Sequence, residues 1–428
     1  MIKLTRFILF FFLLSSQSLF AQLRPAVPET EGFSSARLKK IDAMLHGYTD
    51  NPEHTVAGVA AIVARNGRIV YYTAAGYRDI AHKIPLQKDD IFRIASQTKA
   101  VTAVAVMMLY EEGKILLDDP ISKYIPEFSH PKVLKTFDAA DSSYTTVPAS
   151  REVTIRDLLT HTSGISYAVI GTKEANAIYG KAGIPVGFEP RHIRLADKMK
   201  ILAGLPLMHQ PGAAFTYGLS IDILGYMVEI VSGMSLKDFF RQRIFEPLGM
   251  KDTYFYIPPA KQSRLAKVYT TNEKGEAVED DSKDSSGANT IYPLVKNGTY
   301  YSGGAGLCST AYDYAVFLQM LENGGIYNGH RLLSPSTVRL MTTNQIGDLG
   351  LWGSPDKFGL SFEVVTENGS ARFPWNPGTF SWGGFWGSLY WADPKAGIVA
   401  QIWTQHPAAG WTEMSNKFKV MVYSALEK

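Results

Sequence analysis

An almost uniformly apolar helix is the feature of this sequence that most limits its fold. Residues 100–109 read AVTAVAVMML, with no charged side chain. A helix without a polar face has to be covered on all sides, so we expect it in the middle of a domain. Ser96 and Lys99 stand at its start, and helical side chains three residues apart meet on one face. A lysine at the mouth of a buried helix is costly unless something uses it.

The first residues are typical of a secretory signal. Lys3 and Arg6 precede the apolar run 7–14, and Ala21 follows a polar stretch. The apolar run is too short to cross a bilayer. We therefore expect cleavage of residues 1–21, a periplasmic or secreted protein, and no stable membrane insertion afterwards. An uncleaved membrane anchor is the alternative, because Leu19 stands where cleavage prefers a small residue.

The mature chain would be nearly neutral. Lys3 and Arg6 leave with the signal, so 43 basic residues fall to 41 against 40 acidic ones. This balance gives no attraction to nucleic acid, and we expect no such partner. The single cysteine, Cys308, cannot form an internal disulfide and is expected in the core. The histidines show no His-x-x-x-His pair, so we expect no metal and no cofactor.

Strand-like segments at both ends of the chain enclose a helical middle. Residues 56–72 form two apolar runs around Asn66-Gly67, the strongest short hairpin signal. Strand patterns return in two later segments, 358–365 and 379–405, where the Asp393-Pro394 turn and Gly397 separate two β-rich runs. Apolar spacing predicts helices at 220–233, 309–325 and about 414–426.

This order of elements predicts an α/β fold with two lobes. We expect an antiparallel sheet built from the N- and C-terminal segments and flanked by helices, with an inserted, mainly helical lobe. The α/β lobe would span about 22–95 and 300–428, and the helical lobe about 96–299. Together they would form one domain, 22–428, with a cleft between the lobes as the expected place for a site.

The pair Ser96 and Lys99 can support nucleophilic catalysis. A hydroxyl at a helix N-terminus faces the positive end of the helix dipole, which favours developing negative charge. Lys99 can act as a base if burial keeps it neutral part of the time. Alternatively, Ser96 caps the helix and Lys99 extends to water. The same spacing recurs at Ser354 and Lys357, where no long helix follows and we expect a loop.

Two further motifs favour the catalytic interpretation. The loop PGAAFTYG places Tyr217 just before a predicted helix, and a neighbouring lysine would stabilise its phenolate. An ordinary buried aromatic is the alternative. Trp382-Gly383-Gly384 lies in a strand-like run, and paired glycines there permit close approach of the backbone to a ligand. A backbone N–H of this strand and that of Ser96 could hold an oxyanion.

These motifs, in this order, resemble the serine β-lactamase and penicillin-recognising superfamily. Its signature is Ser-x-x-Lys, a tyrosine motif and a Lys-Thr-Gly-like strand. The matching segments cover almost all of residues 30–425 and read FRIASQTKAVTA, LLTHTSGI, PGAAFTYGLSIDILG, STAYDYAVFL and WGGFWGSLYWADP. More narrowly, the chain is similar to bacterial carboxylesterases of β-lactamase type, which have Trp-Gly-Gly in place of Lys-Thr-Gly.

The resemblance implies a β-lactamase/transpeptidase-like fold and a serine hydrolase that forms an acyl-enzyme on Ser96. Lys99 and Tyr217 would share the proton transfers. The backbone N–H groups of Ser96 and Phe385 would form the oxyanion hole, and Trp382 would line the acyl pocket. The remaining expected substrate contacts are Gly383, Gly384 and Leu219.

Two departures from the family bear on the substrate. Trp382 stands where β-lactamases and DD-peptidases have a lysine that helps to hold the substrate carboxylate, and Leu219 where they commonly have asparagine. An apolar lining favours small to medium carboxylic esters, and the expected partner is a small-molecule ester or amide. The alternatives are a β-lactamase or D-Ala-D-Ala carboxypeptidase and, in another class, a catalytically silent binding or sensor protein.

Two further features lie near these motifs, the segment 166–200 and His161. The segment 166–200 is long enough to border a substrate cleft, and we expect it to shape specificity. His161 belongs to no Ser-His-Asp triad, because the sequence has no Gly-x-Ser-x-Gly elbow. We expect His161 to orient its loop.

Overall fold

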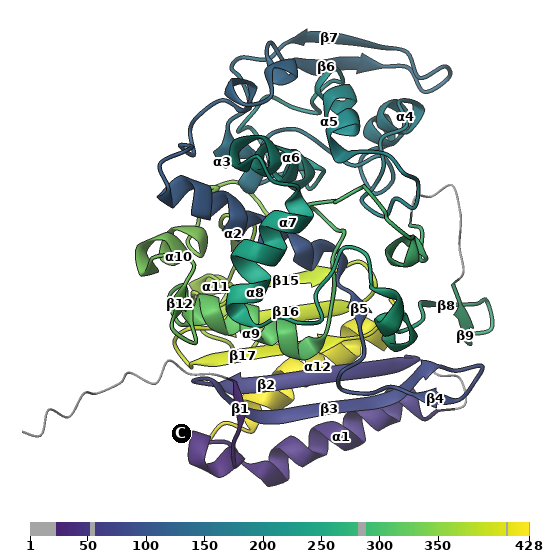
Figure 1. Ribbon diagram of the computed structural model, residues 1–428, viewed down its shortest axis with the longest axis vertical. Coiled ribbons are helices and arrows are strands. Elements are labelled where there is room, and N and C mark those ends of the chain that lie inside the picture. The colour runs from purple at the N-terminus through teal and green to yellow at the C-terminus, as the bar shows by residue number, and fades with distance from the viewer. Residues whose placement is uncertain (1–22, 52–55, 281–287, 408–409, 428) are drawn as a thin grey trace, which may run out of the picture.

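The structure is a computed structural model that describes residues 23–51, 56–280, 288–407 and 410–427. The expected signal, 1–21, lies outside this range. The described chain forms two stacked lobes, with a sheet and its helices in one and mostly helices in the other (Figure 1).

The sheet joins the two ends of the chain. Its order in the described residues is β1-β3-β2-β17-β16-β15-β14-β13, with β4 paired to β3, and all pairings except β1 with β3 are antiparallel. This confirms the predicted antiparallel sheet. Its strands are β1 (Arg24–Pro25), β2 (Gly58–Arg65), β3 (Arg68–Asp79), β4 (Ile84–Pro85), β13 (Lys357–Phe358), β14 (Glu363–Val364), β15 (Phe380–Gly384), β16 (Ser388–Asp393) and β17 (Ile398–Trp403).

Strand β2 shows how the sheet separates two cores. Successive side chains of a strand point to opposite faces. Val59 and Val63 join the core with α1 (Ser35–Thr49) and α12 (Gly410–Ser424). Ala60 and Ile62 join the larger core, which also contains α2 (Thr98–Glu111) and α9 (Ala311–Glu322). Every residue of β2 except Arg65 is buried, because both faces are covered.

Two tight turns join neighbouring strands of the sheet. Asn66 and Gly67 both have positive φ, 50° and 76°, as the predicted two-residue hairpin turn requires. The segment 379–405 differs from prediction, because it contains three strands rather than two β-rich runs. The extra turn lies between β15 and β16, where Gly387 has φ 81° and its N–H bonds to the Gly384 carbonyl oxygen.

The helical lobe surrounds α2. Every residue of α2 from Thr98 to Leu109 is buried, as its composition predicts. The hairpin of β6 (Lys132–Phe137) and β7 (Tyr144–Pro148) closes this lobe at its far end (Figure 1). The other helices of the lobe are α3 (Ile155–Leu159), α4 (Lys173–Lys181), α5 (Leu195–Ala203), α6 (Ser220–Ser232), α7 (Leu236–Phe240) and α8 (Glu246–Leu248). The remaining elements of the chain include β5 (Phe92–Arg93), β8 (Tyr269–Thr271), β9 (Ala277–Glu279), β10 (Cys308–Ser309), β11 (Ile326–Tyr327), β12 (His330–Arg331), α10 (Pro335–Met341) and α11 (Glu367–Ser370).

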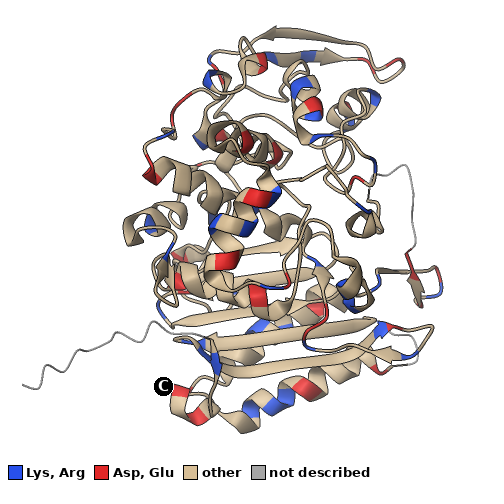
Figure 2. Cartoon of the chain, viewed as in Figure 1, with Lys and Arg blue, Asp and Glu red and all other residues tan. Residues whose placement is uncertain are grey.

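Charges of both signs occur in both lobes (Figure 2). Within the residues that the structure describes, no helix is long and apolar enough to cross a membrane. Cys308 is fully buried, as expected, and its thiol lies 3.6 Å from the Tyr292 hydroxyl.

Candidate active site

Ser96 lies in a 3-10 turn, Ala95–Gln97, immediately before α2. Its side chain is partly exposed, whereas its neighbours Ala95 and Gln97 are buried. Ala95 has φ 45°, in the left-handed region that costs a residue with a side chain about 1–3 kcal/mol. The N-terminus of α2 has no side-chain cap, so the capping alternative for Ser96 is not what the structure shows. This turn presents one hydroxyl to the surface from an otherwise buried segment.

Lys99 is buried beneath that hydroxyl, with 1 % of its surface exposed. Its Nζ donates hydrogen bonds to Ser96 Oγ at 3.2 Å, to Tyr167 Oη at 3.0 Å and to the Gly304 carbonyl oxygen at 2.8 Å. An ammonium group has three donors, and all three have acceptors here. If Lys99 loses a proton, the Ser96 hydroxyl can donate to it through the same contact.

Tyr167 is a member of the site that sequence analysis missed. Burial, followed by the charges of Tyr217 and Asp222, raises the pKa of Tyr167 well above its ordinary value. Its phenol therefore stays protonated at neutral pH and positions Lys99 instead of acting as a base. In the sequence, Tyr167 could have been noticed as the tyrosine two residues after the LLTHTSGI segment, inside the stretch 166–200.

Tyr217 faces Lys99 with its ring. The Lys99 Nζ lies 4.6 Å from the ring centroid, which allows a cation–π interaction. The Tyr217 hydroxyl instead accepts a hydrogen bond of 3.2 Å from Trp382 Nε1. From the sequence, we expect the lysine to stabilise a phenolate and Trp382 to line a pocket. The structure adds that the indole N–H of Trp382 holds the phenolic oxygen.

Strand β15 brings Trp382 and the two glycines beside the Ser96 turn. A Cβ atom on Gly384 would lie 2.5 Å from the Ile94 carbonyl oxygen, so the strand approaches the turn as closely as glycine permits. Gly383 and Gly384 are partly exposed, and Phe385, directly after the strand, is 45 % exposed. The expected oxyanion donors, the N–H groups of Ser96 and Phe385, therefore belong to adjoining segments.

Leu219 does not fit its expected role. Its side chain has no exposed surface and packs in the core of the helical lobe. The residue stands at the start of α6, and its N–H bonds to the Ser166 carbonyl oxygen at 3.3 Å. This position turns the leucine inward, so it supports the loop of Tyr217 and offers no exposed surface to a ligand.

His161 lies behind Tyr217. Its Nδ1 accepts a hydrogen bond of 3.4 Å from the Gly218 N–H, and its ring centroid lies 4.7 Å from that of Tyr217. Burial, followed by the charge of Lys99, lowers the pKa of His161 well below its ordinary value. A neutral histidine that receives a backbone N–H of the tyrosine loop is consistent with the expected orienting role.

Asp222 supports Lys99 from a second layer and was given no role from the sequence. Its Oδ1 accepts hydrogen bonds from Ser302 Oγ at 2.5 Å and from the Gly304 N–H at 3.2 Å. Gly304 in turn accepts from Lys99 through its carbonyl oxygen. Burial raises the pKa of Asp222, and the Ser302 hydrogen bond and the Lys99 charge oppose that rise.

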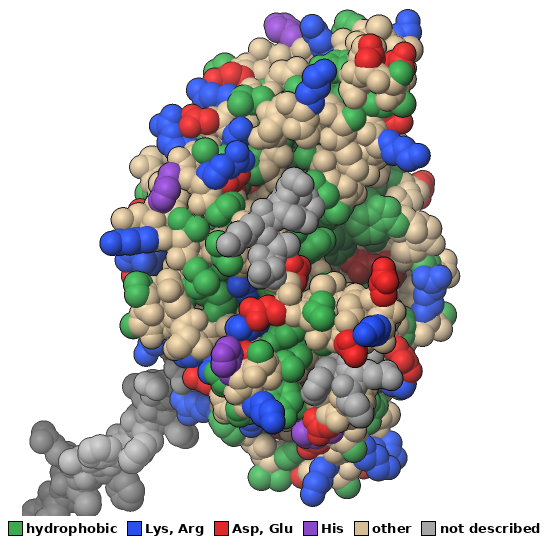
Figure 3. Space-filling model, turned by 90° about the vertical axis from the view of Figure 1, so that its right-hand side faces the viewer, with side chains coloured by type: hydrophobic (Ala, Val, Ile, Leu, Met, Phe, Trp, Pro, Cys, Tyr) green, Lys and Arg blue, Asp and Glu red, His purple; other side chains and the backbone are tan. Residues whose placement is uncertain are grey.

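The surface near the junction of the lobes is hollowed. Hydrophobic side chains line this hollow when the molecule is seen from the right-hand side of Figure 1 (Figure 3). The second Ser-x-x-Lys meets the loop expectation only in part, because Ser354 closes a turn with Leu351 whereas Lys357 begins β13. The Lys357 Nζ donates to the Leu349 carbonyl oxygen at 2.9 Å. Among the described residues, no group of three His, Cys, Asp or Glu side chains could hold a metal ion.

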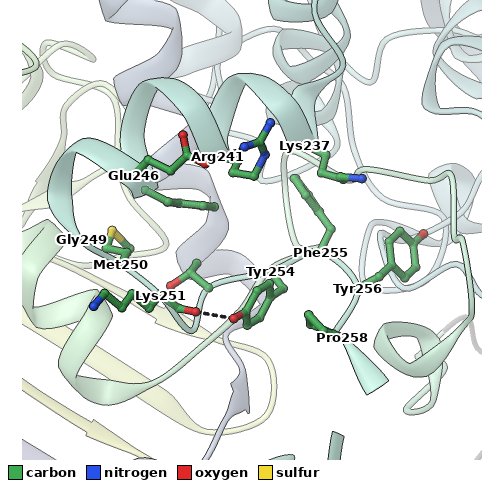
Figure 4. Close-up of a pocket in the computed structure, with 12 residues that line it drawn as sticks. Lys237, Arg241, Glu246, Gly249, Met250, Lys251, Tyr254, Phe255, Tyr256 and Pro258 are labelled. Carbon is green, nitrogen blue, oxygen red and sulfur yellow. Dashed lines mark hydrogen bonds and ion pairs between the residues drawn. The ribbon is translucent and has the colours of Figure 1, made fainter. Parts of the chain in front are cut away.

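A separate cavity of about 590 Å³ opens beside α7 (Figure 4). Phe245, Met250 and Phe255 contribute apolar surface to its lining. A Cβ atom on Gly306 would lie 2.9 Å from the Phe255 ring, and Gly304 nearby accepts from Lys99. The cavity therefore adjoins the segment 304–306, whose Gly304 carbonyl oxygen binds Lys99. Ser96 is not part of the cavity lining.

Comparisons with known proteins agree with this geometry. The Beta-lactamase family model matches residues 38–417. Esterase EstB of Burkholderia gladioli is 31 % identical over 367 residues, covering 82 % of this chain and 86 % of EstB. Lovastatin esterase of Penicillium rubens is 32 % identical, covering 66 % of this chain and 67 % of that enzyme. The solved structure of EstCE1, a hydrolase with promiscuous acyltransferase activity, superposes with a TM-score of 0.76 at 28 % identity, covering 92 % of this chain and all of EstCE1.

A family model that spans most of the chain and a relative of this identity and coverage show the family. The turn that carries Ser96 lies against strand β15, so the Ser96–Lys99 pair lies where the helical lobe meets the sheet. The chain belongs to the β-lactamase family, and it is an enzyme of the serine hydrolase type that has esterases and acyltransferases among its relatives.

Proposed function

We propose that this protein is an exported serine esterase that cleaves small to medium carboxylic esters, or transfers their acyl group, through an acyl-enzyme on Ser96. The contact of 3.2 Å between Lys99 Nζ and Ser96 Oγ carries this proposal, because it joins a nucleophile at the surface to a buried proton acceptor.

The reaction would take place in two halves. Ser96 Oγ attacks the ester carbonyl carbon while its proton passes to neutral Lys99 or to the Tyr217 phenolate. The carbonyl oxygen becomes an oxyanion that the N–H groups of Ser96 and Phe385 hold. When the intermediate collapses, the ester bond breaks and the departing alcohol takes up the proton. Water or an acceptor alcohol then attacks the acyl group, with the proton transfers reversed.

The hydrogen bond between Trp382 and Tyr217 supports an ester substrate. A lysine at position 382 would offer a cation to a substrate carboxylate, whereas the Trp382 indole is neutral and already donates to the tyrosine. Trp382 is also 9 % exposed and packs against the aromatic rings of Phe358 and Trp352. Such surroundings suit an uncharged, apolar acyl group better than a carboxylate.

Relatives support both hydrolysis and transfer. Esterases and acyltransferases stand side by side among them. EstCE1 is described as a hydrolase with promiscuous acyltransferase activity. Transfer requires only that an alcohol replaces water in the second half of the reaction.

Two other functions remain as outcomes of the test. A β-lactamase or D-Ala-D-Ala carboxypeptidase would use the same nucleophile on a cyclic or peptide amide. A silent binding protein would have no need of the Ser96–Lys99 contact, although that contact is present.

The test compares two substrates on protein that lacks residues 1–21. Hydrolysis of p-nitrophenyl butyrate and of a chromogenic cephalosporin would be measured for the wild type and for Ser96→Ala. The matched control is Ser143→Ala, an exposed serine in the turn between β6 and β7. We expect ester hydrolysis that Ser96→Ala abolishes and Ser143→Ala retains, with slow or no cephalosporin opening. Efficient cephalosporin opening would favour the β-lactamase, and turnover that survives Ser96→Ala would reject the nucleophile.

A further inference from the structure

Trp352 occupies a backbone position that is unfavourable for tryptophan. The Ser354 N–H bonds to the Leu351 carbonyl oxygen at 2.8 Å and closes a four-residue turn. The two central residues, Trp352 and Gly353, have φ 49° and 74°. Positive φ at both positions defines a type I′ turn, which favours asparagine or glycine at the first of them and disfavours bulky residues. Strain of this kind persists where the surroundings or function require it.

The Trp352 side chain is also unusually exposed. It retains 65 % of its accessible surface, more than any other exposed large hydrophobic side chain among the described residues. The turn needs no aromatic ring for its own hydrogen bond, and a tryptophan adds apolar surface to the solvent side. Neither the turn nor the core therefore explains why tryptophan stands here.

The ring of Trp352 rests on the candidate active site. It is stacked against Trp382, with centroids 5.9 Å apart and an interplanar angle of 27°. It meets Tyr217 edge to face at 5.7 Å, and Phe215 at 5.1 Å. Trp352 thus extends outward the aromatic surface whose inner part is the Trp382 ring bonded to Tyr217.

We propose that Trp352 is a specificity-determining residue, whose exposed surface forms the outer wall of the acyl site and stacks on an aromatic acyl group of the substrate ester. This inference rests on the proposed function and names a substrate class for it. Aromatic rings in offset or edge contact attract each other beyond the area that they bury. An acyl group bound to Ser96 that extends past Trp382 meets Trp352 next.

A structural role for Trp352 makes different predictions. If the ring only covered Tyr217 and Trp382, its loss would lower thermal stability and would reduce the turnover of all esters equally. Trp352→Asn separates the two, because asparagine suits the first central position of a type I′ turn. The substrate role predicts an unchanged or higher midpoint of thermal unfolding together with altered selectivity.

The experiment uses two esters that share a leaving group and differ in the acyl part, p-nitrophenyl acetate and p-nitrophenyl phenylacetate. The readout is the ratio of kcat/KM for the phenylacetyl ester to that for the acetyl ester. We expect Trp352→Asn to lower this ratio about tenfold, as loss of one aromatic contact implies. Trp352→Phe should keep most of the ratio. The control is Tyr144→Ala, which removes another exposed aromatic ring, 41 % exposed, from β7 and should leave the ratio unchanged.

An equal fall for both esters, or a lower unfolding midpoint in Trp352→Asn, would overturn the inference. If the wild type hydrolyses neither ester, this result rejects the proposed function but does not decide the role of Trp352. A second measurement then tests that role. Calorimetry with methyl phenylacetate would then compare Ser96→Ala with Ser96→Ala/Trp352→Asn. About tenfold weaker binding in the double variant would support the role of Trp352, and equal binding or no binding to either would reject it.

Discussion

Lys99 is held by atoms from three separate segments of the chain. Ser96 precedes it by one turn, Tyr167 follows α3 and its loop, and Gly304 lies beyond the helical lobe. Each partner restricts a different direction of the side chain, so the amine stays under the Ser96 hydroxyl. If Lys99 accepts the Ser96 proton, as we propose, this fixed placement is what general-base catalysis needs.

The two tyrosines of the site should respond differently to loss of their hydroxyl groups. Tyr217→Phe removes a candidate base and should lower kcat for p-nitrophenyl butyrate by about 100- to 10,000-fold. Tyr167→Phe removes one hydrogen bond from Lys99 and should cost about 10- to 100-fold, because a bond to a charged group contributes about 1.5–3 kcal/mol. Steady-state kinetics with both variants checks this order. A larger loss in Tyr167→Phe would make Tyr167 the base instead.

Gly384 and Gly383 offer a matched pair of alanine substitutions. A Cβ on Gly384 would press on the Ile94 carbonyl oxygen at 2.5 Å, two residues before Ser96. A Cβ on Gly383 would meet the Ser388 carbonyl oxygen at 3.0 Å, a smaller conflict. We expect Gly384→Ala to lower kcat/KM at least 100-fold, as loss of an oxyanion donor does, and Gly383→Ala to lower it far less. Equal losses in the two kinetic measurements would show that strand spacing is not the cause.

At single residues, the sequence points to the site where the local pattern contains the chemistry, and the catalytic roles themselves stay predictions. The sequence indicated Ser96, Lys99, Tyr217 and Trp382, and the structure brings them together. It misjudged Leu219, since nothing local tells whether a residue after a motif faces the cleft or the core. Tyr167 and Asp222 were missed because their partners, Lys99 and Gly304, come from distant parts of the chain.

At the scale of elements, α6 joins the tyrosine loop to the support of Lys99. The helix begins directly after Tyr217, Gly218 and Leu219, and its first turn presents Asp222 to Ser302 and Gly304. One rigid element therefore fixes both a candidate base and the carbonyl group that anchors Lys99.

Substitution of Asp222 should weaken fold and activity together. Asp222→Ala leaves the Ser302 hydroxyl and the Gly304 N–H buried without their acceptor, at about 1–3 kcal/mol for each group. Gly304 would then hold Lys99 less firmly, and we expect kcat to fall at least tenfold. Asp222→Asn retains an acceptor oxygen and should recover most of the stability. Urea unfolding with parallel kinetics measures both effects, and an Asp222→Ala variant with wild-type kcat would contradict the supporting role.

Element prediction worked best for long periodic segments. The helix predicted at 220–233 is Ser220–Ser232, and that predicted at 309–325 is Ala311–Glu322. The helix α4 and most of α5 lay in the stretch 166–200, which was treated as one insert, because each helix has only nine residues. The strand pattern at 379–405 did not reveal the turn at Gly387, because this glycine stands among aromatic residues, which favour strands.

At the scale of the whole molecule, the segment 166–200 is part of the helical lobe rather than an appendage. It includes Tyr167, which bonds to Lys99, and Tyr179, which is fully buried and donates to the Pro206 carbonyl oxygen. Deleting it would remove core and catalytic support together, so loss of activity would not report on specificity. Its role in specificity stays a prediction, and substitutions of the exposed Val169 and Ile170 are the suitable test.

Export is the prediction that concerns the whole chain. The described structure begins at Leu23, whose side chain is 3 % exposed and whose N–H donates to the Tyr327 hydroxyl at 2.9 Å. Arg24 and Pro25 then pair with β3, so the fold engages the chain directly after the expected cleavage site. Cleavage after Ala21 would therefore release the start of the folded domain intact.

Expression of the full chain in a bacterium should give a periplasmic or secreted protein whose intact mass corresponds to a start at Gln22. Replacement of Phe10 and Leu13 by aspartate should block export by interrupting the apolar run. Recovery of the complete chain, Met1 included, in the membrane fraction would favour the uncleaved anchor.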